Sequence, residues 1–123
     1  MNDQTLLQRQ VHPNFVPDGE LSSQAFYPFP KDNGRLSVYD SDKISPEASF
    51  RHYSVDLGYS SAGVWGVDCG EVAGAGLTSQ PDSIPNSPAH AYIDFGQRVD
   101  KECRKLAKKL KEFAAARGCL HKP

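Results

Sequence analysis

Alternating apolar and polar residues predict several β-strands along this chain. The clearest strand is expected from Ala89 to Phe95, where His90, Tyr92 and Asp94 share one face and the apolar residues share the other. The same pattern predicts shorter strands at residues 6–12, 22–27, 36–39 and 62–67. Prolines at positions 81, 85 and 88 interrupt the stretch before Ala89, so we expect an irregular loop there.

Two short helices are predicted from their starting residues. The tripeptide Ser45-Pro46-Glu47 favours a helix start, because a serine hydroxyl can accept free backbone amides and proline fits the first turn. Apolar residues follow it at positions 50, 53 and 57, which is helical spacing. Asp68 and Glu71 have the spacing of a capping box, which predicts another short helix after the strand at 62–67.

The longest helix is predicted from about Asp100 to Arg117, with Gly118 beyond its end. Apolar residues recur along one side of it, at Cys103, Leu106, Leu110 and Phe113. The opposite side carries Lys101, Arg104, Lys105 and Lys108. A lone helix of this length is marginal in water, so we expect the apolar side to be buried against the rest of the chain or a second subunit.

These elements predict a single α+β domain over residues 1–123, a length sufficient for one hydrophobic core. We expect a mixed or antiparallel sheet of about five strands with helices packed on it. A basic amphipathic helix and tail, residues 98–123, closes the chain. The periodicities predict a core that includes Phe50, Trp65, Val67, Ile93 and Phe95.

The net charge of −1 conceals opposite charges in two parts of the chain. Nine basic and three acidic residues lie from Arg98 onward, whereas five basic and twelve acidic residues precede it. We expect the basic helix face to be solvated, or to contact the acidic remainder, a protein partner or a second copy of the chain. Contact with nucleic acid is a less favoured alternative. No membrane contact is expected, because the apolar side is narrow.

The cysteines and histidines do not form a recognisable metal or disulfide pattern. Cys69, Cys103 and Cys119 are odd in number and widely spaced, and no C-x-x-C pair is present. The four histidines lack the spacing of metal ligands, so we expect no metal and no other cofactor. Because we find neither a transmembrane stretch nor a secretion signal, we expect a soluble cytoplasmic protein with reduced thiols.

Several segments resemble a family of small prokaryotic proteins. These segments are His12-Pro13, Asp18-Gly19, Ser22–Phe26, Leu36–Val38 and Pro88–Ala91, and the similarity extends over about residues 9–95. No activity is established for that family. The resemblance therefore implies a prokaryotic origin and no catalytic residue, and the basic C-terminal helix lies outside it.

The catalytic candidates are His90, Asp94 and Cys69. His90 shares a strand face with Asp94, so a carboxylate could orient an imidazole that titrates near neutral pH. Ordinary polar residues on a half-solvated strand explain this pattern as well. Cys69 begins a predicted short helix, where the thiol pKa falls and a thiolate could pair with His90. A small buried cysteine is the more common arrangement.

A second set of residues predicts a pocket for a phosphate or nucleotide-like ligand. Ser22, Ser23 and Ser37 place hydroxyls in apolar strand contexts, and Arg9 and His12 would add positive charge beside them and His90. An ADP-ribosyltransferase-like site would use such residues, but a catalytic glutamate motif is missing. Serines at strand edges also satisfy local backbone groups without any ligand.

Two functions of different classes follow from these residues. The first is a non-enzymatic accessory protein that binds a ligand or a protein partner. The second is a small enzyme that acts on a nucleotide-like or phosphorylated ligand through His90 and the serines. Because no complete catalytic set is visible in the sequence, we favour binding. Convergence of His12, Ser22, Ser37 and His90 on one concave pocket would favour the second function.

Overall fold

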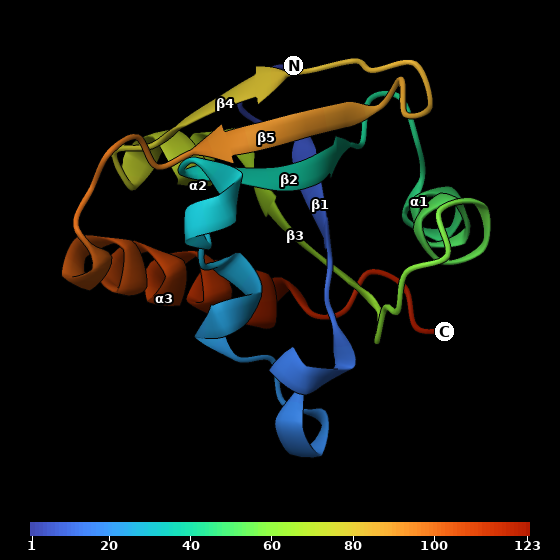
Figure 1. Cartoon of the computed structure of the whole chain (residues 1–123), viewed down its shortest axis with the longest axis horizontal. Helices are drawn as coiled ribbons and strands as arrows, with labels where there is room; N and C mark the ends of the chain where they lie inside the picture. Colours follow the sequence, from blue (N-terminus) through green and yellow to red (C-terminus); the bar gives the residue numbers. More distant parts are fainter.

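Five strands form one sheet in the computed structural model, which describes residues 1–123 (Figure 1). In chain order they are β1 Leu6–Gln10, β2 Arg35–Asp40, β3 Val64–Asp68, β4 Thr78–Pro81 and β5 His90–Asp94. The strand order across the sheet is β3-β1-β2-β5-β4, and every neighbouring pair is antiparallel. The α+β fold class is therefore confirmed, with the antiparallel form of the sheet.

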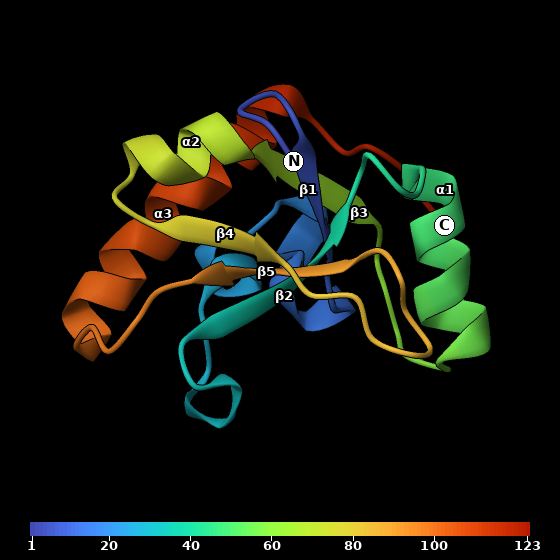
Figure 2. The ribbon, with the colours of Figure 1, turned by 90° about the horizontal axis from the view of Figure 1, so that it is seen from above.

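Three helices flank the sheet, with α2 and α3 together on one side and α1 on the other (Figure 2). They are α1 Pro46–Arg51, which continues as a π-helical turn over His52–Asp56, α2 Cys69–Gly74 and α3 Asp100–Arg117. Ser45 caps α1 through the Ala48 amide, as predicted. The capping box of α2 is also confirmed by its two hydrogen bonds, between Asp68 and Glu71 in both directions.

One predicted strand is absent, and one observed strand was not predicted. The segment expected to be a strand at 22–27 contains a 3₁₀ helix, Ser23–Phe26, whose Ala25 and Phe26 are buried. This turn packs against α3 and has no partner strand, so its apolar residues are buried without pairing. In the stretch expected to be a loop, β4 was missed because it ends at Pro81. That proline is tolerated because β4 is an edge strand with only β5 beside it.

One face of the sheet forms the hydrophobic core. Leu7, Leu36, Val38, Val67 and Ile93 lie on this core face and are each at most 2% exposed. The long helix α3 packs over β3 and the 3₁₀ turn, so its apolar side is buried within its own chain. The buried residues of α3 are Cys103, Ala107, Leu110 and Ala114, while Leu106 and Phe113 lie half-buried at the margins.

The core prediction is confirmed for four residues and wrong for one. Trp65, Val67, Ile93 and Phe95 are buried, whereas Phe50 is only half-buried and its ring lies 5.1 Å from that of His121. Helix α1 covers polar side chains of β1 rather than the apolar core. Its buried residue is Ser49, whose hydroxyl accepts a hydrogen bond from Gln10 Nε2.

The sheet opens between β1 and β2. These strands pair only at Leu7–Asp40 and Gln8–Tyr39, and then β1 turns away while β2 continues beside β5 (Figure 1). On the other side, the C-terminal tail covers the edge of β3 through hydrogen bonds that join Val64 to Leu120 and His121. No helix of the chain is long and apolar enough to cross a membrane.

A candidate site on the outer face of the sheet

The face of the sheet opposite the core, called the outer face here, carries polar side chains. Ser37 and Tyr39 of β2 and His90 of β5 lie on it because they alternate with core residues along their strands. Asp82 follows β4 and continues its pairing, since the Asp82 amide donates to the His90 carbonyl. Strand alternation and antiparallel register thus gather hydroxyl, imidazole and carboxylate groups on one surface.

Two adjoining cavities open on this face where β1 and β2 diverge. They have volumes of about 430 and 310 Å³ and share four lining residues, Arg9, Gln10, Ser37 and Tyr53. We call the two cavities together the outer groove. The larger, called the basic cavity, is also lined by His12, Lys31 and Asp32. The smaller, called the aromatic cavity, is also lined by His90, Tyr39, Leu57, Tyr59 and Ile84.

Arg9 lies in the opening between β1 and β2. Its Nε donates to the Ala25 carbonyl at 2.8 Å, and its Nη1 donates to the Ser37 carbonyl at 2.9 Å. Burial lowers the pKa of Arg9, an effect opposed by the nearby Tyr53 and Asp32, and arginine remains charged in proteins. No carboxylate lies within ion-pair distance of this half-buried guanidinium, so neutral carbonyls are its only partners.

Ser37, His90 and Asp82 form a chain of hydrogen bonds. His90 Nδ1 lies 3.1 Å from the backbone carbonyl of Asp82 and 3.1 Å from its Oδ2. Both oxygens accept, so Nδ1 of the neutral ring must carry the proton. His90 Nε2 lies 3.2 Å from Ser37 Oγ and is then the acceptor for the serine hydroxyl. This order of groups is that of a nucleophile, a general base and an orienting carboxylate.

A second histidine is held in a similar way at the edge of the groove. His52 Nε2 donates to the Asn86 carbonyl at 2.6 Å, so Nδ1 accepts from the Tyr39 hydroxyl at 2.7 Å. Burial raises the pKa of Tyr39 to about 12, which keeps this hydroxyl protonated as a donor. The loop after β4 therefore fixes both histidines through its own carbonyls.

Four of the predicted ligand-binding residues meet in the outer groove. Arg9 and Ser37 line both cavities, His12 lines the basic cavity and His90 lines the aromatic cavity. The His12 Nδ1 accepts from the Asn14 amide at 3.0 Å, which leaves its Nε2 to face a ligand. His12 and His90 line different cavities and Ser22 lines neither, so His12, Ser22, Ser37 and His90 do not converge on one pocket; Arg9 and Ser37 are the predicted residues that the two cavities share.

The other predicted site residues lie elsewhere. Ser22 lines neither cavity of the groove, and Ser23 lines a different cavity, beside α3. Asp94 shares the face of His90, but its Oδ1 accepts from the Gly96 amide and the carboxylate beside His90 belongs to Asp82. Cys69 is buried in the core cluster, on the opposite side of the sheet from His90, so the two do not form a nucleophilic pair.

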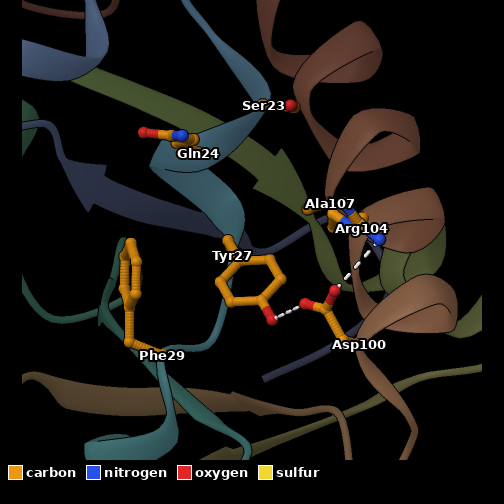
Figure 3. Close-up of a pocket in the computed structure, with 7 residues that line it drawn as sticks. All are labelled: Ser23, Gln24, Tyr27, Phe29, Asp100, Arg104 and Ala107. Carbon is orange, nitrogen blue, oxygen red and sulfur yellow. Dashed lines mark hydrogen bonds and ion pairs between the residues drawn. The ribbon is translucent and has the colours of Figure 1, made fainter.

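The cavity beside α3 is the main alternative site (Figure 3). Its volume is about 340 Å³, and Tyr27 and Asp100 point toward each other across it. The Tyr27 hydroxyl donates to Asp100, a bond that raises the Tyr27 pKa, and Asp100 also pairs with Arg104 at 3.0 Å. Its charged groups already have partners in one another, unlike Arg9 of the outer groove.

Asp82, which bonds His90, and Tyr53, which lines both cavities, were among the residues missed from the sequence. Asp82 follows a proline in a stretch expected to be a loop, so its register beside His90 was not visible. Tyr53 was assigned to an apolar helix face, although its ring lines both cavities. The sequence does contain one indication of Asp82. It lies eight positions before His90, and Pro88-Ala89 directly precede His90, a spacing that suits a short connection between antiparallel strands.

Comparison with known proteins adds no assignment. No family model matches the chain, and neither a curated protein nor a solved structure matches it. The resemblance over residues 9–95 gains no support from these comparisons, so the geometry of the chain is the ground for a functional assignment. No group of three or more histidine, cysteine, aspartate or glutamate side chains is placed to hold a metal ion.

Proposed function

We propose that this protein binds a small organic anion, a carboxylate or a phosphate ester, in the outer groove. The observation that carries the proposal is Arg9, a half-buried guanidinium that lines both cavities and has no carboxylate partner. Charge held away from water is costly unless an opposite charge approaches it. An anionic ligand in the groove supplies that charge, and the planar guanidinium suits both carboxylate and phosphate oxygens.

The rest of the basic cavity supports the same ligand class. Lys31 adds a second positive charge and His12 a ring donor, against the single carboxylate of Asp32. The adjoining aromatic cavity offers Tyr59 and Ile84, which are 58% and 44% exposed, as apolar contacts for the remainder of the molecule. A concave site with a few convergent polar groups and an apolar wall is typical of small-molecule sites.

The alternatives are less well supported. None of the residues that line the two cavities is a glutamate, so an ADP-ribosyltransferase-like reaction lacks its acidic residue. Docking of a protein partner or second subunit through the apolar side of α3 has no surface left, because that side packs on the sheet. The lysines of α3 make no ion pair and point to solvent, which is ordinary for a surface helix.

Calorimetric titration with three probes tests the proposal: adipate, adenosine monophosphate and inorganic phosphate. We expect the wild type to bind at least one of them. Arg9→Gln should weaken that binding about ten- to hundredfold, the effect of losing a charge-assisted hydrogen bond. Lys31→Gln, an exposed position, should weaken it by a smaller factor.

Arg35→Gln is the matched control for Arg9→Gln. Arg35 lies on the outer face, and its guanidinium stacks 4.7 Å from the centre of the Tyr92 ring and lines neither cavity. Its substitution removes the same charge and should leave the dissociation constant unchanged. If both variants bound the ligand equally weakly, the net charge of the protein, and not contact with Arg9, would explain the effect. Absence of binding of all three probes to the folded wild type would refute the proposal.

A further inference from the structure

We infer that Ser37, His90 and Asp82 are a hydrolytic triad that cleaves esters of anionic acyl groups in the outer groove. The inference rests on the proposed function, since it places the anionic part of the substrate beside Arg9. It adds a reaction, ester hydrolysis, and assigns each part of the substrate to one of the two cavities. The nucleophile is the Ser37 hydroxyl, the general base is His90, and Asp82 is the positioning residue for the imidazole.

The tautomer of His90 is fixed in the productive form. Its Nδ1 proton is held by two acceptors of Asp82, and its Nε2 lone pair faces Ser37 Oγ at 3.2 Å. That separation lies at the upper end of the range for a nucleophile and its base, which shortens when substrate binds. The His90 side chain is 20% exposed, so its Nε2 is reachable from the aromatic cavity while Nδ1 stays oriented.

The position of His90 determines which part of the ester lies in which cavity. A general base that deprotonates the serine must later protonate the leaving alcohol, so that alcohol lies on the His90 side. His90 lines the aromatic cavity and not the basic one. The leaving alcohol is therefore apolar or aromatic, beside Tyr59 and Ile84. The acyl part extends into the basic cavity and carries the negative charge.

Donors for the transition-state oxyanion are available at Ser37. Arg9 Nη1 already bonds the Ser37 carbonyl, and Arg9 and Tyr53 line both cavities with Ser37. Burial raises the pKa of Tyr53, so its hydroxyl stays protonated and can donate. A guanidinium and a phenol next to the nucleophile stabilise charge that develops on the carbonyl oxygen.

The reaction balances with water as the only co-reactant. Ser37 Oγ attacks the ester carbonyl carbon while its proton passes to His90 Nε2, giving a tetrahedral oxyanion. The carbon–oxygen bond to the alcohol then breaks, and the alcohol leaves with the proton from His90. Water, deprotonated by His90, attacks the acyl-serine. The acid is released, and the proton returns to Ser37 Oγ.

The test uses the 4-nitrophenyl monoester of adipic acid, with 4-nitrophenyl hexanoate as the neutral substrate of equal chain length. We expect the wild type to release 4-nitrophenolate from the adipate ester faster than from the hexanoate ester. Ser37→Ala and His90→Gln should each lower kcat about a thousandfold or more, and Asp82→Asn should also lower it strongly. Intact mass should show one adipoyl group on Ser37.

Controls separate this chemistry from unfolding and from the ligand site. Ser22→Ala and Asp94→Asn alter a hydroxyl and a carboxylate outside the groove and should keep wild-type rates. Ser37→Ala should melt at the wild-type temperature, so that its lost activity does not come from unfolding. Diisopropyl fluorophosphate should phosphorylate Ser37, with transfer of a diisopropylphosphoryl group and loss of fluoride, in the wild type and not in His90→Gln.

Each outcome decides between the two proposals. Adipate binding without hydrolysis above the Ser37→Ala rate, and without phosphorylation of Ser37 by diisopropyl fluorophosphate, would overturn the triad and leave the ligand site intact. Phosphorylation of Ser37 by diisopropyl fluorophosphate without cleavage of the adipate ester would support the activated serine and overturn the assigned acyl class. Absence of binding of all three anion probes to the folded wild type would instead overturn the proposed function.

Discussion

The two faces of the sheet are built from the same strands and do different things. On the core face, Leu36 and Val38 of β2 are at most 2% exposed and pack under the helices. On the outer face of the same strand, Ser37 is exposed beside the groove. Strand alternation alone separates them, since successive side chains point to opposite faces. Stability is therefore concentrated on one face, and the candidate chemistry on the other.

The opening between β1 and β2 can hold a half-satisfied polar group because it lies at the margin of the core. Arg9 is a half-buried charge without an anion, and its backbone partners are the Ala25 carbonyl of the 3₁₀ turn and the Ser37 carbonyl of β2, beyond the point where β1 and β2 pair. Such a group in the middle of the core face would be strongly destabilising. The opening between β1 and β2 lets the guanidinium reach the groove without entering the core.

The largest effect on stability is expected for Phe95→Ala on the core side. Phe95 is 0% exposed, and truncating a buried aromatic residue usually lowers the free energy of unfolding by about 3–5 kcal/mol. Ser37→Ala, on the outer face, should change it by less than about 0.5 kcal/mol. Urea unfolding followed by circular dichroism compares the two. Similar losses in both variants would erase the distinction between the faces.

A smaller, pH-dependent effect is expected from Tyr39, the most buried tyrosine of the outer face. Burial raises its pKa from 10.0 to about 12, so the unfolded chain loses this proton at a lower pH than the folded protein. Its contribution to the free energy of unfolding is thus complete below about pH 10 and is lost as the pH rises to about 12. Urea unfolding of the wild type and Tyr39→Phe across that window measures it. If the free energy of unfolding changed with pH equally in the two proteins across this window, the raised pKa of Tyr39 would be contradicted.

Replacement of Asp68 tests the contacts that join the end of β3 to α2 and α3 on the core side. Its carboxylate caps α2 through the Glu71 amide, and its Oδ2 lies 3.5 Å from Arg117 of α3. Asp68→Ala should lower the free energy of unfolding by about 1 kcal/mol, mainly through loss of the cap. The neighbouring Asp3→Ala, an exposed position, is the control in thermal melts. No difference between them would show that the cap contributes nothing.

The smallest effect is expected on the solvent side of α3. Lys101, Lys105 and Lys108 are exposed and make no ion pair, so changing all three to glutamate should alter the free energy of unfolding by about 0–1 kcal/mol. Binding of adipate in the outer groove should remain within a few-fold of wild type at physiological salt, because distant surface charges are screened. A large loss of stability or of adipate binding in this variant would show that the solvent side of α3 contributes to folding or to binding.

The sequence predicted the position of a site residue correctly where alternation within a single strand determines it. Ser37 and His90 stand out as polar residues in apolar strands, and alternation places them on the face opposite Val38 and Ile93. Two features depend on pairing between strands instead. Asp82 reaches His90 only through the register of β4, which its proline concealed. Arg9 has its role only because β1 and β2 separate, and no local pattern shows where two strands stop pairing.

The segment at 22–27 shows a different limit. It was expected to be a strand, whereas Ala25 and Phe26 are buried within a 3₁₀ turn. Secondary structure there is decided by α3, which packs on the segment and leaves no strand beside it. For the same reason Ser22 and Ser23, expected to line one pocket with Ser37, lie outside the outer groove.

Mapping the ligand on the two faces by nuclear magnetic resonance tests the central claim most directly. Adipate would be titrated into ¹⁵N-labelled protein while the amide chemical shifts are followed residue by residue. The account predicts that the largest changes occur at Arg9, Ser37 and Tyr53, and that they vanish in Arg9→Gln while Arg35→Gln retains them. Changes centred on Tyr27 and Arg104 of the cavity beside α3, or changes spread evenly over the surface, would contradict it.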